Sequence, residues 1–408
     1  MNNHNLWWGP PKNFSTEHKE RKITWLELFY DLVYVIVISR ITQHFAAQPD
    51  LNGLVYYVFI FGMIFWGWLN GSTYYDLHGT PGIRTNLTTL WQMLAVAAFA
   101  VTLNFEKDNN FFYLTIALCF LQAYITYLWW SVGIYDKHHR KLNIPFSVCY
   151  LGALALLVLA LYVPAPYRII IYWVALIINY SPGAFIYKIM RRRSEEELSL
   201  SPSMTERLGL FTIIIFGEMI LGVINGMHGS DGHSGRMWIC FALGILIVFS
   251  LWLIFFSLVA DRDCKAGFMN GQFFQLLFVP SLLSLGIMGA SFYILLPATL
   301  SGGDHLTAIT RLYFGLSISV FLTCVFGITR FLCYEEKYGD PKKLIAVILL
   351  IPAVLIATTT LLFQPLSLLR YFTLVFAVLL AMIIAITYSW YRTEKSLETS
   401  TDSASDDQ

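Results

Sequence analysis

The chain is poor in charged residues. Asp, Glu, Lys and Arg together make up only 13% of its 408 residues, and the formal net charge is +1. So small an excess of basic residues gives no reason to expect nucleic acid or another polyanion as a partner. The sequence also lacks a glycine-rich phosphate loop, a nucleophile elbow and a Cys-x-x-Cys pair. We therefore expect no cofactor and no enzymatic activity.

Apolar residues dominate instead. Hydrophobic residues account for 57% of the chain and aromatic residues for 16%, which leaves too little polar surface to coat a soluble globule. The sequence therefore predicts an integral membrane protein that has the lipid bilayer as a partner. The six cysteines fall within or beside the apolar runs, where packing is expected rather than a disulfide framework.

Long apolar runs predict an all-α polytopic membrane protein with about twelve transmembrane helices, because about 20 apolar residues cross ~30 Å of hydrocarbon. The expected spans cover 24–44, 54–74, 87–105, 111–133, 144–163, 169–189, 208–227, 237–260, 273–296, 306–326, 344–363 and 369–388. Lys and Arg are concentrated in the N-terminal tail and in every second loop, as Arg140 and Arg192 illustrate. The positive-inside rule then places both termini in the cytoplasm.

Polar segments divide the chain into parts. We expect a cytoplasmic N-terminal segment (1–22), a first six-helix half (23–190), a cytoplasmic linker (191–205), a second six-helix half (206–391) and a disordered acidic tail (392–408). Ser203 and Glu206 form a capping-box pattern, which predicts the start of a helix after the linker. The tail is acidic, rich in Ser and free of large apolar clusters, a composition typical of disorder.

The two halves open on related strings, ERKITWLELFYDL and ERLGLFTIIIFGE. Each has Glu-Arg, an apolar stretch, and an aromatic residue with an acid close behind, which indicates a weak parallel repeat. The longer strings ERKITWLELFYDLVYVIVIS and ERLGLFTIIIFGEMILGVI resemble the landmarks of the bacterial low temperature requirement A (LtrA) family, over about Arg21 to Tyr388. The resemblance implies a multi-pass protein of the bacterial inner membrane, associated by name with growth in the cold. It implies no particular biochemical activity.

Three acids lie inside the apolar runs: Glu27 and Asp31 in the first, and Glu218 in the seventh. A carboxylate at bilayer depth costs about 2.5 to 3.5 kcal/mol on insertion scales, so it is seldom kept without a partner or a task. Glu27 and Asp31 share one helix face, where two close carboxylates cannot both ionise cheaply. Glu218 falls roughly 15 Å deep by helical rise. It follows Gly217, whose missing side chain is expected to admit a neighbouring helix or substrate.

Three arginines are candidate counter-charges. Arg21 and Arg207 lie at the cytoplasmic edge, from which they could neutralise acids of the opposite half. Arg311 is flanked by apolar residues within the tenth expected span. It could pair with an acid, bind an anionic substrate or extend its charge to the interface.

Other polar residues are candidates for a cavity or a metal site. The segments 70–72 and 179–183 combine Asn, Gly, Ser or Pro, which makes them candidates for helical backbone that opens and lines a cavity; kinks without a function are the alternative. The loop that contains His228, Asp231 and His233 has residue types that bind metals. No fourth ligand is evident, so no metal site is predicted.

These residues favour a proton- or cation-coupled secondary transporter of a small solute. Glu218 and Asp31 would carry the proton or cation, and Glu27 would tune the affinity of Asp31. Arg207 and Arg21 would supply counter-charge in the closed state. Two alternatives stay open: a passive channel in which the acids select ions, and a non-transport protein of cold adaptation in which the acids are ion-paired or protonated packing residues. The expected partners are the bilayer and a small solute or ion, with homo-oligomerisation open.

Overall fold

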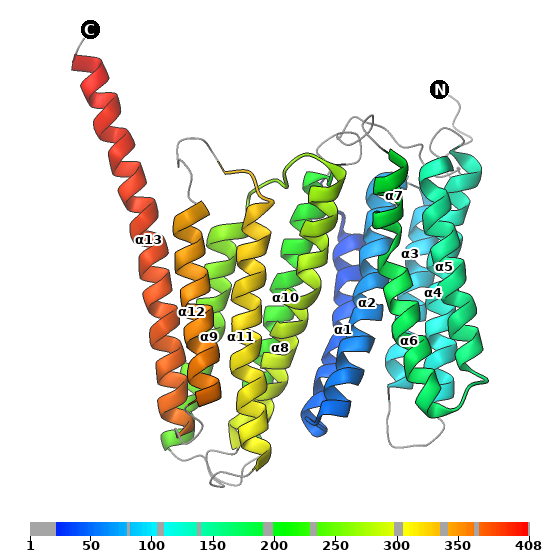
Figure 1. Ribbon diagram of the computed structural model, residues 1–408, viewed down its shortest axis with the longest axis horizontal. Helices are drawn as coiled ribbons and strands as arrows, with labels where there is room; N and C mark the ends of the chain where they lie inside the picture. The colour runs from blue at the N-terminus through cyan, green and yellow to red at the C-terminus, as the bar shows by residue number, and fades with distance from the viewer. Residues whose placement is uncertain are drawn as a thin grey trace. The chain divides into compact units, whose positions relative to one another are not determined.

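The computed structural model describes residues 22–79, 82–103, 110–136, 140–190, 199–228, 235–297, 305–334, 342–362 and 367–406. Within these residues the fold is helical, apart from an isolated antiparallel bridge between Cys264 and Leu332 (Figure 1). The helices are α1 (Trp25–Ala47), α2 (Leu51–His78), α3 (Ile83–Thr102), α4 (Asn110–Tyr135), α5 (Arg140–Ala160), α6 (Ala165–Tyr180), α7 (Pro182–Met190), α8 (Pro202–His228), α9 (Gly235–Val259), α10 (Phe268–Leu295), α11 (His305–Arg330), α12 (Lys342–Leu362) and α13 (Leu368–Asp406).

Nine of the described helices are long and apolar enough to cross a membrane: α2, α4, α5 and α8 to α13. The chain is therefore a multi-pass membrane protein. The other helices are more polar or shorter, since α1 contains Glu27, Asp31 and Arg40, and α6 has only 16 residues. Each expected span overlaps one described helix, except 169–189, which overlaps both α6 and α7.

The chain divides into two compact units. Unit 1 comprises Met1–Phe211 and Ala266–Gln272, and unit 2 comprises Thr212–Lys265 and Phe273–Gln408. The division therefore falls within α8 and not in the linker where the sequence placed it. The physical reason lies in the first turns of α8, which pack inside unit 1. There the ring of Phe211 lies 4.3 Å from that of Trp68 on α2, measured between centroids.

Helix α2 forms the centre of unit 1 and contacts α1, α4 and α6. Every residue from Phe59 to Ser72 is buried, so the helix has no face toward lipid or water over this stretch. A helix that is apolar all round, as the string FIFGMIFWGWL is, belongs in such a central position. Its start is fixed by Asp50, whose Oδ1 accepts the backbone N–H of Gly53 at 2.7 Å.

The backbone opens at the junction of α6 and α7, within the segment 179–183. Helix α6 ends at Tyr180 and α7 begins at Pro182, because proline has no N–H with which to continue the hydrogen-bond ladder. The carbonyl of Ile178, which Pro182 cannot bond, accepts instead from the N–H of Ser181 at 3.1 Å and from its hydroxyl at 2.7 Å. The break therefore leaves this carbonyl paired.

Buried amides surround the break and replace further backbone bonds. The indole N–H of Trp66 donates to the carbonyl of Asn179 at 3.0 Å, and the side-chain amides of Asn179 and Gln122 bond each other at 2.8 and 2.9 Å. Asn70 donates to the carbonyl of Trp66 and accepts the hydroxyl of Tyr150. Helix α2 runs without interruption through its Asn-Gly-Ser segment, so the backbone opening expected there is not formed.

Helices α8 and α10 approach closely within unit 2, at glycines. A Cβ on Gly222 would lie 2.3 Å from the carbonyl oxygen of Gly289, and one on Gly226 would lie 2.8 Å from that of Phe292. A Cβ placed on Gly217 would meet no described atom within 4 Å, so this glycine does not admit a neighbouring helix. The tightest approach of the two backbones is at Gly222 and Gly226 instead.

Helix α13 continues to Asp406, so the backbone of the tail expected to be disordered from 392 is helical up to that residue. The sequence from Leu366 to Gln408 contains neither Gly nor Pro. Nothing in it breaks the helix that the apolar part of α13 has already nucleated. Composition therefore gave the wrong backbone state here.

Gly222→Ala should destabilise unit 2, because its methyl group would collide with a backbone carbonyl that has no rotamer with which to move away. Overpacking of this kind costs roughly 1–3 kcal/mol. Gly152→Ala is the matched control, since a Cβ there meets no described atom within 4 Å and alanine favours the helix. Thermal unfolding of the purified protein in detergent should show a lower midpoint for the first variant alone. Equal midpoints would contradict the close approach.

Candidate functional site

A buried ion cluster lies within unit 1. Arg207 on α8 donates through Nη2 to Oδ1 of Asp31 on α1 at 2.6 Å, and its Nη1 lies 3.5 Å from Oε1 of Glu27. The side chains of Arg207, Asp31 and Glu27 are only 1%, 0% and 8% exposed. The two acids of the first expected span therefore share one arginine in a dry setting.

Glu27 also caps the helix on which it lies. Thr24 precedes α1, and Oε2 of Glu27 accepts from the backbone N–H of Thr24 at 2.9 Å and from its hydroxyl at 3.0 Å. The Thr24 hydroxyl in turn accepts the N–H of Glu27, which completes a capping box. The Thr-x-x-Glu pattern in the sequence signals this role, which the sequence analysis missed. A negative charge in the first turn is further favoured by the helix dipole.

The start of α8, which positions Arg207, is bound to the end of α2. Ser201 caps the helix by accepting the N–H of Met204 at 3.1 Å, and Pro202 occupies the first helical position. The hydroxyls of Ser201 and Ser203 donate to the two carboxylate oxygens of Asp76 at 2.5 and 2.6 Å. Ser203 therefore contacts Asp76 and is not the cap that its capping-box pattern predicted. Asp76 is a positioning residue that sequence reasoning missed.

Aromatic rings enclose the ion pair. The indole N–H of Trp68 donates to Oδ1 of Asp31 at 2.7 Å, so this one oxygen receives two donors. The guanidinium carbon of Arg207 lies 5.6 Å from the ring centre of Tyr30 and 5.8 Å from that of Trp68, within the range of cation–π attraction. Glu27, Tyr30, Asp31, Trp68 and Arg207 are together called the Asp31 cluster.

A second polar group extends the Asp31 cluster toward α3. The side-chain nitrogen of Gln92 lies 2.7 Å from the hydroxyls of Tyr30 and Tyr34, and 3.1 Å from the carbonyl oxygen of Gly67. Gly71 makes room for it, because a Cβ there would lie 2.3 Å from the Tyr30 hydroxyl. Gln92 is fully buried on a helix that the sequence analysis assigned no role.

Several buried polar atoms of this region have no hydrogen-bond partner among the described residues. They are Oδ2 of Asp31, Nε and Nη1 of Arg207, and Oε1 of Gln92. The large majority of buried side-chain polar atoms in proteins are hydrogen-bonded, so four such atoms in one region are unusual. The bare carboxylate oxygen is an acceptor for a proton or a water molecule.

The remaining candidates lie elsewhere. Glu218 is buried on the part of α8 that belongs to unit 2. Arg311 lies on α11 in the same unit, with its guanidinium carbon 5.7 Å from the ring centre of Tyr371. Arg21 lies outside the described residues, as do Asp231 and His233 of the candidate metal loop. No group of three or more His, Cys, Asp or Glu in the described part of the chain is placed to hold a metal.

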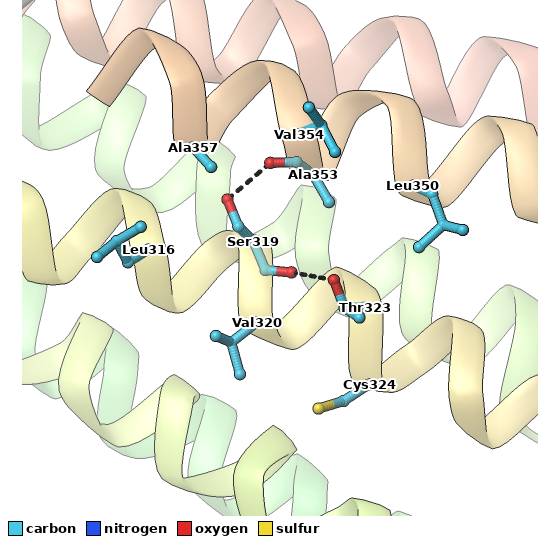
Figure 2. A pocket seen from close by; sticks show the side chains of 9 residues that line it. All are labelled: Leu316, Ser319, Val320, Thr323, Cys324, Leu350, Ala353, Val354 and Ala357. Carbon is cyan, nitrogen blue, oxygen red and sulfur yellow. Dashed lines mark hydrogen bonds between the residues drawn. The ribbon is translucent and has the colours of Figure 1, made fainter. Parts of the chain in front are cut away.

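A pocket of about 310 Å³ opens between α11 and α12 of unit 2 (Figure 2). It is lined by Leu316, Ser319, Val320, Thr323, Cys324, Leu350, Ala353, Val354 and Ala357. Its hydroxyl donors are already engaged, since Ser319 donates to the carbonyl of Ala353 at 2.8 Å and Thr323 to that of Ser319 at 2.8 Å. The pocket lining therefore suits an apolar ligand and has no charged side chain with which to bind an ionic solute.

A family model described as Bacterial low temperature requirement A protein (LtrA) matches residues 22–390. This range contains the whole Asp31 cluster together with Glu218 and Arg311. No curated protein matches the chain.

Arg207→Met should destabilise the protein strongly, because it leaves Asp31 buried beside Glu27 without its cation. Removing one partner of a buried pair costs about 3–5 kcal/mol. Adding Asp31→Asn should recover part of the loss, since no uncompensated charge then remains at that position. Arg40→Met on the exposed part of α1 is the control and should be close to neutral. Unfolding midpoints measured for the full cycle should be non-additive, and additivity would show that the two residues do not interact.

Proposed function

The chain belongs to the bacterial low temperature requirement A (LtrA) family, and we propose that it is a proton- or cation-coupled secondary transporter of a small solute. The observation that carries the proposal is the bare Oδ2 of Asp31. A carboxylate that is sealed from solvent, held at one oxygen only and placed beside an arginine can bind and release a positive charge. A purely structural acid would be expected to have both oxygens paired.

We propose a topology of twelve spans in two six-helix halves, in the bacterial inner membrane with both termini cytoplasmic. The spans would include α1, α3 and the α6–α7 pair, which carry buried polar residues of unit 1 such as Asp31, Gln92 and Asn179. The alternation of Lys and Arg between loops supports the orientation. The related openings of the two halves support a parallel repeat.

In this scheme Asp31 and Glu218 carry the proton or cation in their respective units. Glu27 tunes Asp31 through the arginine that both acids contact, and Arg21 adds counter-charge at the cytoplasmic edge. Arg207 is bonded to Asp31 while the site is unloaded. A positive charge that binds Asp31 competes with this bond and weakens the attachment of α8 to α1.

One observation favours a second function. Arg207 contacts both Asp31 and Glu27, as it would if the acids served only to hold the helices together. The chain would then be a non-transport membrane protein required for adaptation to cold. The two proposals differ in what they require of the acids: the first needs an acid that changes charge, and the second needs only opposite charges in contact.

Glu218→Gln should abolish solute-coupled ion movement while the protein still folds and inserts, because glutamine keeps the shape of the acid and cannot bind a proton. Amino acids, sugars and organic ions would be added one at a time to proteoliposomes that contain a pH-sensitive dye, under proton and sodium gradients. Glu206→Gln is the matched control, since Glu206 lies exposed on the same helix. Wild-type coupling in the Glu218→Gln variant would refute the assigned role.

Exchanging the charges of Asp31 and Arg207 separates the two functions. The double variant Asp31→Arg, Arg207→Asp should recover much of the stability that either single change removes, since the pair is restored in reverse. A transporter should stay inactive, because position 31 no longer has a carboxylate to bind the proton or cation. Two measurements on the double variant separate the functions: transport activity, and growth at low temperature of a strain that depends on the protein. Full recovery of both would favour the non-transport function.

A further inference from the structure

The donors around Asp31 all bind one of its oxygens. Trp68 and Arg207 donate to Oδ1 at 2.7 and 2.6 Å, while Oδ2 has no hydrogen-bond partner among the described residues. From this geometry we infer that the coupling ion is a proton and that it binds at Oδ2 of Asp31. The inference rests on the proposed transport function and specifies its ion.

A metal cation does not fit the same place. Hard cations such as Na⁺ or Ca²⁺ take several oxygen ligands, and magnesium and calcium sites are built from carboxylates, carbonyls and water. The contacts of Asp31 are instead an indole N–H and a guanidinium. Arg207 opposes any added positive charge, the proton included, so the ions differ here in the number of ligands that they need. A proton meets this requirement, because it binds a single oxygen as a covalent O–H group and needs no further ligands.

The other groups that face Asp31 are each engaged elsewhere. On α1, Glu27 uses Oε2 in the capping box, and the Tyr30 hydroxyl lies against Gln92. On α2, the hydroxyl of Tyr75 lies 3.1 Å from that of Tyr124, and the Tyr75 ring is T-shaped to the Tyr30 ring with centroids 6.3 Å apart. The titratable and charged groups around Asp31 are thus Glu27, Tyr30 and Tyr34 from α1, Tyr75 from α2 and Arg207 from α8, with neutral Trp68 and Gln92 beside them. Among these, Asp31 is the carboxyl with an oxygen that no described donor occupies.

Protonation has a direct structural consequence. A neutral carboxyl is a weaker acceptor than a carboxylate, and charge-assisted hydrogen bonds are about twice as strong as neutral ones. Proton binding at Oδ2 therefore weakens both bonds at Oδ1. Arg207 keeps Glu27 as an opposite charge, while its bond to Asp31 and that of Trp68 loosen together. The Trp68 indole is consequently a built-in reporter of the protonation state of Asp31.

The experiment uses the full chain in lipid nanodiscs and needs no solute. Infrared difference spectra between high and low pH should contain a protonated-carboxyl band that Asp31→Asn loses and that Glu206→Gln, an exposed acid on α8, retains. The chain has 12 tryptophans, so the contribution of Trp68 is taken as the difference between wild type and Trp68→Phe. That contribution should shift with pH in wild type, and the shift should be absent from Asp31→Asn.

The controls keep the inference open to refutation. Trp68→Phe retains the acid and must retain the infrared band. If Asp31→Asn does not fold, Asp31→Glu keeps a carboxyl and must move the band to another frequency; an unmoved band overturns the assignment. Sodium, lithium or potassium added at constant pH should leave the Trp68 signal unchanged.

The outcomes also separate this inference from the proposed function. A Trp68 shift caused by sodium in wild type and lost in Asp31→Asn would overturn the proton, while cation-coupled transport would stand. A proton on Asp31 in a protein that moves no tested solute would refute transport and leave the proton site in place. Absence of the Asp31 band at every pH at which the protein stays folded would overturn the inference outright.

Discussion

The bond between Arg207 and Asp31 determines how unit 1 is built. It joins the first turns of α8 to α1 across 176 residues of sequence, and both side chains are withdrawn from water. Such a pair contributes little net stability, because the desolvation of two charges offsets most of their attraction. The pair contributes to specificity instead, because any arrangement of the helices that buries one charge without the other is strongly unfavourable. Phe211 against Trp68 then completes the packing that assigns the start of α8 to unit 1.

The surrounding hydrogen bonds serve to hold this pair in one geometry. Asp76 binds both hydroxyls at the start of α8, which fixes where along the helix Arg207 falls. Thr24 and Glu27 fix the start of α1 in the same way. Each helix that carries a charge of the pair is therefore anchored at its nearest end. The only oxygen of Asp31 left outside this scheme is the one to which function is assigned.

The helices could be predicted from sequence far better than the site. Apolar runs and charge alternation are local signals, and each expected span overlaps a helix, with Pro182 explaining the division of the sixth. The acids could be recognised because they interrupt hydrocarbon. Arg207 could be named as a counter-charge, but the neutral groups around the ion pair could not, since Trp68, Gln92 and Ser201 make their key bonds across 37, 62 and 125 residues. The helical tail was misjudged because low hydrophobicity indicates weak packing and does not by itself stop a helix that is already formed.

The buried guanidinium and carboxylates also have a thermal signature. Hydration of charged groups becomes more favourable as temperature falls, so the penalty for keeping them dry rises on cooling. Helices held by dispersion and lipid-facing packing lack this dependence. We therefore expect the interaction between α8 and α1 through this cluster to weaken on cooling, when the surrounding bilayer becomes stiffer. The buried ion cluster at the start of α8 thus gives the attachment of this helix to α1 a temperature dependence of its own.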